Sequence, residues 1–126
     1  MGRCRLAEAR RSLRTSALLG VLWGASCIGV GCTTLGDDVR RAEHAFAEAR
    51  YEDVEVWLAD LAPSLGKMPP PLRARYYYLA GMSAYRIGRR APARHALALC
   101  REELAASDAD FPEEWKRNLQ QVLAEL

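Results

Sequence analysis

The sequence predicts an all-α domain of two helix–turn–helix units and a C-terminal capping helix, preceded by a signal peptide. Three observations indicate this fold class. From residue 37 onward, apolar side chains recur every three or four positions, the spacing of one helix face. Glycine and proline stand where such helices would end or begin. Small side chains occur where the two helices of a hairpin would have to touch.

The first unit is expected within residues 37–61. Asp37 and Asp38 place negative charge at the start of its first helix, where the helix dipole favours it. The apolar face of that helix is formed by Val39, Ala42, Ala45, Phe46 and Ala49. After a break near residues 50–51, a second helix presents Val54, Trp57, Leu58 and Leu61. Residues 63–71 are expected to be a linker, because consecutive prolines cannot extend a helix.

The second unit is expected within residues 74–104, as two helices joined by a tight turn. Gly81 lies inside the first apolar run, where two helix backbones would need a close approach. Gly88 breaks the pattern where the first helix should end. Pro92 falls in the first turn of the next helix, where its missing N–H costs nothing.

This central stretch resembles a tetratricopeptide repeat, a helix–turn–helix unit of about 34 residues. With Gly81 at the eighth position of the motif, the further matches are Tyr77 (fourth), Tyr85 (twelfth), Gly88 (fifteenth), Ala93 (twentieth) and Leu97 (twenty-fourth). Ala80 and Ala84 replace the usual Leu and Tyr. Residues 37–61 fit as a second, degenerate copy, with Ala42 at the eighth position and Ala49 at the fifteenth. The resemblance implies a short α-solenoid of two repeats and places Cys100 in the core.

The last segment predicts one further helix. Asp110, followed three residues later by Glu113, has the spacing of a capping box. One apolar face then contains Trp115, Leu119, Val122, Leu123 and Leu126. We expect this helix to cover the open end of the stack, so that residues 37–126 form the helical domain. Because solenoid units bury their apolar faces only against neighbours, we expect modest stability for this domain alone and a gain from a partner or from self-association.

The N-terminal segment predicts export. Residues 1–16 contain five arginines opposed by one glutamate, and an uncharged apolar run follows from Ala17 to Val30. This run is shorter than the roughly 20 residues that a helix needs to cross a bilayer. A positive start, a short apolar centre and small residues at a cleavage site are typical of a secretory signal peptide, here residues 1–31.

The sequence Gly29-Val30-Gly31-Cys32 resembles the lipobox of bacterial lipoproteins, which implies lipidation of Cys32 and a tether over residues 32–36. Cys27 is a second candidate. Two alternatives remain: the peptide is cut without lipidation, or it stays uncut as an anchor, because residues 15–36 carry no charge. An aspartate directly after Cys32 would resemble an inner-membrane retention signal, but Thr33 and Thr34 follow it instead. In a cell with two membranes we therefore expect attachment to the outer one.

The charges are segregated along the chain. The 18 basic and 16 acidic residues give a net charge of +2, which comes from the N-terminal segment, so the basic balance does not indicate nucleic-acid binding. Residues 66–101 contain eight bases and no acid, whereas the segments 37–60 and 102–126 are both acidic. Either the central unit gains attraction from its neighbours, or it offers a basic surface to an acidic segment of a partner or to anionic lipid headgroups.

The residues predict binding rather than catalysis. The sequence contains no glycine-rich phosphate loop, and His44 and His95 lie far apart, so we expect no enzyme activity, no cofactor and no metal site. The resemblance to tetratricopeptide repeats implies a peptide-binding groove along the first helix of each repeat, with Arg75, Tyr78, Met82, Tyr85 and Arg86 on the stronger one. The alternative is that this stripe packs against the first unit.

The sequence therefore favours an exported, membrane-anchored adaptor that binds another cell-envelope protein in an assembly or scaffold role. The alternative function is a periplasmic regulator or inhibitor that docks on an envelope enzyme.

Overall fold

The computed structural model describes residues 34–107 and 110–126, which belong to one compact unit. The elements in order are α1 (Leu35–Ala47), α2 (Tyr51–Leu61), the 3-10 helix η1 (Ala62–Lys67), α3 (Pro70–Arg86), α4 (Arg90–Ala106) and α5 (Glu113–Glu125). These residues contain no strand, so the all-α prediction is confirmed. The predicted signal peptide and Cys32 lie outside the described residues. Among the described residues, no helix combines the length and apolar character needed to span a bilayer.

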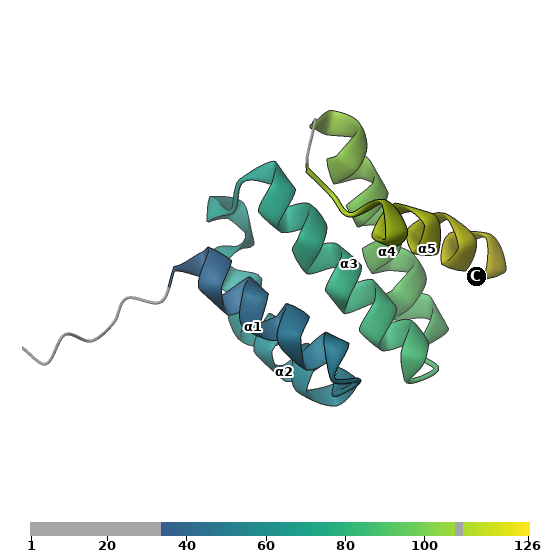
Figure 1. Ribbon diagram of the computed structural model, residues 1–126, viewed down its shortest axis with the longest axis horizontal. Helices are drawn as coiled ribbons and strands as arrows, with labels where there is room; N and C mark the ends of the chain where they lie inside the picture. Colours follow the sequence, from purple (N-terminus) through teal and green to yellow (C-terminus); the bar gives the residue numbers. More distant parts are fainter. Residues whose placement is uncertain (1–33, 108–109) are drawn as a thin grey trace, which may run out of the picture. The chain divides into compact units, whose positions relative to one another are not determined.

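The helices form two hairpins and a final helix. Figure 1 shows α1 and α2 side by side, α3 next to them, and α4 and α5 beyond α3. Helix α3 packs against α1, α2 and α4, and α5 packs against α4. The central position of α3 explains why eight of its residues are buried.

Helix α1 begins at Leu35, two residues before the predicted start, because Thr34 caps it. The amide of Asp37 donates to the Thr34 hydroxyl oxygen at 3.3 Å, and the amide of Thr34 donates to the Asp37 carboxylate at 3.3 Å. These reciprocal bonds satisfy two amide groups that a helix start otherwise leaves unpaired. The hydrogen bond with the Thr34 side chain lowers the pKa of Asp37.

Both hairpin turns use a residue in the left-handed backbone region. Ala49 has a φ of 59° and Gly88 a φ of 82°. In each turn the next amide donates back to a carbonyl five residues earlier, Arg50 to Ala45 at 3.0 Å and Arg89 to Ala84 at 2.8 Å. One sequence prediction is wrong and another is confirmed. Ala49 does not lie on the apolar face of α1, whereas Gly88 follows the end of α3 as predicted, in an exposed turn with open space around it.

The connection from α2 to α3 is more ordered than the predicted linker. Residues 62–67 continue as η1, and α3 begins at Pro70. Proline is tolerated there because the first turn of a helix needs no amide donor. Met68 is only 2% exposed and inserts into the core between these two elements. The connection therefore contributes to packing instead of only spanning a gap.

The predicted close contact between α3 and α4 is confirmed. A Cβ atom on Gly81 would lie 2.5 Å from Leu97 Cγ and 3.1 Å from the Leu97 backbone nitrogen. Leu97, Ala93 and Cys100 line this interface of α4, and all three are fully buried. Glycine at position 81 is thus required by the separation of the two helices, and the prediction that Cys100 lies in the core is also confirmed.

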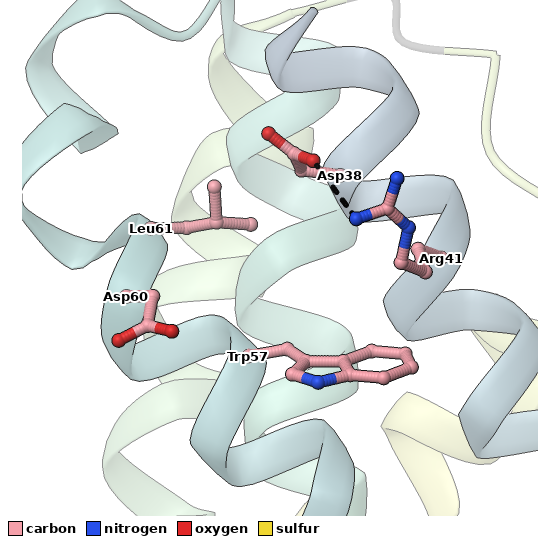
Figure 2. Close-up of a pocket in the computed structure, with 5 residues that line it drawn as sticks. All are labelled: Asp38, Arg41, Trp57, Asp60 and Leu61. Atoms are coloured by element: carbon pink, nitrogen blue, oxygen red, sulfur yellow. Dashed lines mark ion pairs between the residues drawn. The ribbon is translucent and has the colours of Figure 1, made fainter. Parts of the chain in front are cut away.

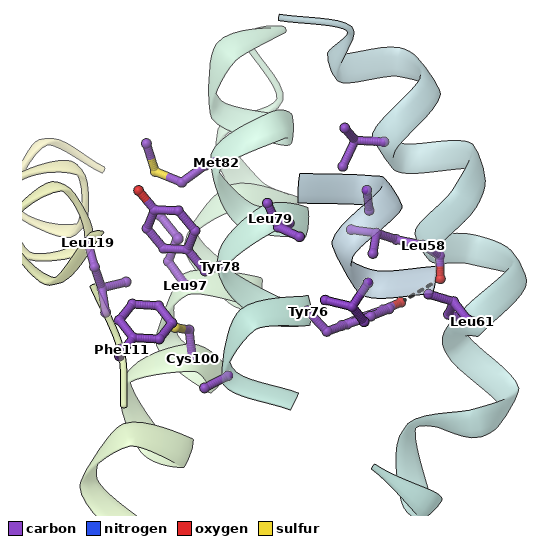
Figure 3. Close-up of a cluster of buried hydrophobic side chains, with 14 of the residues drawn as sticks. Leu58, Leu61, Tyr76, Tyr78, Leu79, Met82, Leu97, Cys100, Phe111 and Leu119 are labelled. Atoms are coloured by element: carbon purple, nitrogen blue, oxygen red, sulfur yellow. Dashed lines mark hydrogen bonds between the residues drawn. The ribbon is translucent and has the colours of Figure 1, made fainter. Parts of the chain in front are cut away.

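The core has two halves, one on each side of α3 (Figure 3). On one side, Tyr76 reaches α2, and its hydroxyl donates to the Leu58 carbonyl at 2.9 Å. On the other side, Tyr78 and Met82 meet Phe111 and Leu119 of the C-terminal segment. Ser83 is also buried, and its hydroxyl has no hydrogen-bond partner within the described part of the chain.

Helix α5 does not start as predicted. It begins at Glu113 after Pro112, and no side chain caps it, so the predicted capping box of Asp110 and Glu113 is wrong. The Phe111 side chain is only 3% exposed, so it anchors the segment before α5 in the core. The carbonyl of Asp110 accepts a bond of 3.4 Å from the Arg75 guanidinium.

Candidate docking surfaces

The predicted groove along α3 is closed by the chain itself. Tyr78 is 1% exposed and Met82 is 2% exposed, so the expectation that these two side chains face an open groove is wrong. Trp115 stacks on the Tyr78 ring with centroids 4.3 Å apart and the planes 9° from parallel. Phe111 contacts the same ring edge-on at 5.5 Å. The sequence alternative, packing against the first unit, holds in part, through an edge-on contact of Phe46 with Tyr78 at 6.3 Å and an ion pair of Arg75 with Glu43.

The other three predicted groove residues have different surroundings. Arg75 is bonded to Glu43 at 3.0 Å, and its guanidinium lies 6.0 Å from the centre of the Trp115 ring. The Tyr85 hydroxyl donates to Glu125 at 2.5 Å, and this bond raises the pKa of Tyr85 and lowers that of Glu125. Only Arg86 is exposed. The stripe therefore contacts α5 and, through Arg75, α1, and it presents the Arg86 side chain to solvent.

Three of the eight bases in residues 66–101 are neutralised within the fold. Arg73 forms a two-pronged pair with Glu103, with N–O distances of 2.8 and 2.9 Å. Arg75 pairs with Glu43 of α1, and Arg89 pairs with Glu55 of α2 at 2.7 Å. For three of the eight bases, these pairs favour the explanation that the basic central unit is attracted to its acidic neighbours within the chain. In the described residues, the remaining bases without an ion pair are Lys67, Arg86, Arg90, Arg94 and Arg101.

A first cleft lies between α1 and α2, with a volume of about 340 Å³. Figure 2 shows the Trp57 indole along one side, with Leu61 and Asp60 of α2 above it and Asp38 and Arg41 of α1 opposite. Asp38 and Arg41 form an ion pair of 3.7 Å. Because Arg41 is paired with Asp38, Asp60 is the remaining charged group of this lining, and the cleft offers no cluster of like charges to a ligand.

A second groove is mainly apolar. It has a volume of about 460 Å³ and is formed by α2, α3 and α4, with a lining that includes Val56, Ala59, Ala80, Ala84, Pro92 and Ala96. Among the described residues, Val56 is the large hydrophobic residue whose side chain is exposed, at 62%. The Arg89–Glu55 ion pair lies at the edge of this groove. Concave apolar surfaces with a few polar groups are the usual form of binding sites.

A third cleft is basic. It lies between the first half of α4 and Leu126, with a volume of about 550 Å³. Its lining is Arg90, Ala91, Arg94, His95, Ala98 and Leu126. Arg90 donates to the carbonyl oxygen of Glu125, whereas Arg94 and His95 are exposed. Positive side chains thus gather over a small apolar floor.

The remaining reactive side chains have structural surroundings. Burial raises the pKa of the Cys100 thiol to about 12, so the reactive thiolate is suppressed at neutral pH. His44 lies 3.2 Å from Glu48 on the exposed side of α1. Within the described ranges, no three His, Cys, Asp or Glu side chains are grouped closely enough to hold a metal ion.

Comparison of the chain with protein families, with curated proteins and with solved structures gives no match.

Proposed function

We propose that this protein is an exported adaptor, anchored to a membrane through lipid on Cys32, whose helical domain binds another cell-envelope protein. The anchor is supported by the N-terminal sequence, which combines arginines, a short apolar run and Gly-Val-Gly before Cys32. Several acyl chains together hold a protein on a membrane much more firmly than one chain does.

The domain is proposed to be a short solenoid of two tetratricopeptide-like repeats with α5 as its cap. The support is the correspondence between the two hairpins. The left-handed residues Ala49 and Gly88 occupy the same position of the motif, and so do the buried Ala42 and Gly81. Proteins of this architecture use their extended surfaces for binding.

The observation that carries the binding role is the apolar groove beside Val56. Its floor consists of alanines from three helices, which allow a partner backbone to approach closely. The groove is separate from the stripe around Tyr78, which α5 already covers. The proposed docking surface therefore moves from the Tyr78 stripe of α3 to the groove that Ala80 and Ala84 of the same helix form with α2 and α4.

Labelling with radioactive palmitate tests the anchor. The full chain should incorporate label, Cys32→Ser should lose it, and the matched control Cys27→Ser should keep it. Label that persists in Cys32→Ser would contradict lipidation at that residue. Membrane retention without label would favour the uncut anchor.

Site-specific photo-crosslinking in intact cells tests the docking surface. A photoreactive residue at Ala59, which lines the groove, should give an adduct of defined mass with an envelope protein. The same residue at Gln120, exposed on α5 and outside the groove, should not. Val56→Asp should abolish the adduct at Ala59. An adduct unchanged by Val56→Asp, or none at any groove position, would refute the assignment.

A further inference from the structure

We infer that the basic cleft between α4 and α5 binds an acidic segment of the partner protein, which deepens the proposed adaptor function and rests on it. In this arrangement, partner carboxylates contact Arg94 and Arg90, and an apolar partner side chain lies on Ala91, Ala98 and Leu126.

The cleft is basic because the fold leaves an arginine in its lining without an acidic partner. Neighbouring carboxylates neutralise Arg73, Arg75 and Arg89, but Arg94 has no acidic partner in the described chain. Arg94 and His95 are both exposed at the cleft, one turn beyond Arg90. Glu125 is an acid that the structure connects to this region, and hydrogen bonds from Tyr85 and Gln121, together with the charge of Arg90, lower the pKa of its carboxyl group. The local field therefore favours an anionic ligand.

The form of the cleft favours a peptide over a small anion. Its volume of about 550 Å³ lies in the range of sites for ligands much larger than phosphate. Three of its six lining side chains are apolar, and these offer a phosphate ion no partner. Glutamate or aspartate next to an apolar residue would satisfy both parts of the lining.

The position of the cleft favours a protein, and not membrane lipid, as the source of the anionic groups that bind there. The first turn of α4 and the end of α5 lie at the opposite end of the helical unit from the start of α1 (Figure 1). The described chain enters the helical unit at α1, so the cleft lies at the end of the unit remote from that entry. An extended acidic partner can reach it there, and one that also fills the groove beside Val56 would contact both faces of α4.

Fluorescence anisotropy with the full chain in a non-ionic detergent tests the inference. The probe is a labelled peptide of repeated Glu-Glu-Leu, and its control is the same peptide with Gln in place of Glu. The acidic peptide should bind, with affinity that falls as salt rises, and the Gln peptide should not. Arg94→Glu should weaken binding about tenfold or more, because a favourable charge contact becomes repulsive.

Arg101→Glu is the matched control. Arg101 is also exposed on α4 without an ion pair in the described residues, and this substitution changes the net charge by the same amount. It lies outside the cleft, so binding should change by less than about twofold. Equal losses in the two variants would overturn the inference, because they would show a response to overall charge only. Circular dichroism of both variants establishes that the fold is intact.

Three further results would overturn the inference. The first is that the parent chain does not bind the acidic peptide, and the second is that inorganic phosphate displaces the peptide as effectively as unlabelled peptide does. The third is that the parent chain sediments as a dimer and Arg94→Glu dissociates this dimer. The second would identify a small-anion site, and the third would identify a second copy as the occupant. None of them bears on palmitate labelling or on the adduct at Ala59, so failure of this inference is distinguishable from failure of the proposed function.

Discussion

The contact between Gly81 and Leu97 gives the sharpest prediction for stability. In Gly81→Ala, the new Cβ would lie 2.5 Å from Leu97 Cγ and 2.6 Å from Cδ2, closer than carbon atoms can approach. Leu97 is fully buried, so its side chain has no open space to move into. The backbone nitrogen of Leu97, at 3.1 Å, limits sideways relief. The two helices must therefore separate, or Leu97 must leave its preferred rotamer.

The magnitude follows from two opposing terms. Overpacking of a core by one methyl group costs about 1–3 kcal/mol. Replacement of glycine by alanine inside a helix contributes about 0.5–1 kcal/mol in the opposite direction. We expect a net loss of about 0.5–2 kcal/mol in the free energy of unfolding. Leu97→Ala alone should cost about 2–5 kcal/mol, because it leaves a cavity at the interface.

Urea unfolding of residues 33–126, followed by circular dichroism, measures these changes in a double-mutant cycle. In the double variant the added methyl occupies part of the space that Leu97→Ala vacates. The combined loss should therefore be smaller than the sum of the single losses by about 1–2 kcal/mol. Gly66→Ala is the matched control, because a Cβ there meets nothing within 4 Å. It should be neutral or stabilising by at most about 1 kcal/mol.

Additive losses in the cycle would refute the reasoning, because they would show that the two side chains do not compete for one space. A stabilising Gly81→Ala would refute it as well, since helix propensity would then outweigh the contact.

Four further predictions use the same unfolding measurement unless another is named. Gly88→Ala should destabilise the domain by about 1 kcal/mol, because a φ of 82° is unfavourable for a residue with a Cβ; an unchanged midpoint would contradict this. Trp115→Ala should cost about 3 kcal/mol, the lower end for a tryptophan, because it removes a partly buried ring stacked on Tyr78, and the urea midpoint should fall without two separate transitions. Folding raises the pKa of Cys100 from 9.0 to about 12, so the stability that this thiol contributes is fully present below pH 9 and is lost as the pH rises toward 12. Between pH 8 and pH 10 the free energy of unfolding of the parent should fall by about 1.4 kcal/mol through this group, and that of Cys100→Ala should not. Arg73→Ala should lower the free energy of unfolding slightly, because it removes the part-buried ion pair with Glu103, and the loss should shrink in high salt. A loss that does not depend on salt would contradict this and assign the effect to packing.

The sequence predicted those features of the fold that depend on one residue and its near neighbours. Gly81 is recognisable because a glycine inside an apolar helical run has a packing reason, and Gly88 because it interrupts the same run. Pro92 lies in the first turn of α4 as expected. Ala49 was placed wrongly because alanine gives no signal of a left-handed turn. Only the equivalence of its position with Gly88 could have indicated it.

The candidate site was less predictable because its openness depends on distant parts of the chain. The pattern on α3 shows that Tyr78 and Met82 share a face, but not that Phe111 and Trp115 cover this face. The signal that could have revealed the cover is the aromatic pair on either side of Pro112, since such a pair is large enough to fill a gap between helices. The groove beside Val56 involves alanines from three helices, and alanine periodicity is too weak to predict which gaps remain open.

The stacking of Trp115 on Tyr78 also provides an optical probe. Trp57, the other indole of the described helices, lies on the first hairpin with the Arg50 guanidinium 5.6 Å from its centre, whereas Trp115 belongs to the last helix. With Trp23 and Trp57 both replaced by Phe, emission would come from Trp115 alone. Its quenching or wavelength shift would then report detachment of the last helix separately from loss of total helicity, so the order in which the two ends of the domain come apart becomes measurable.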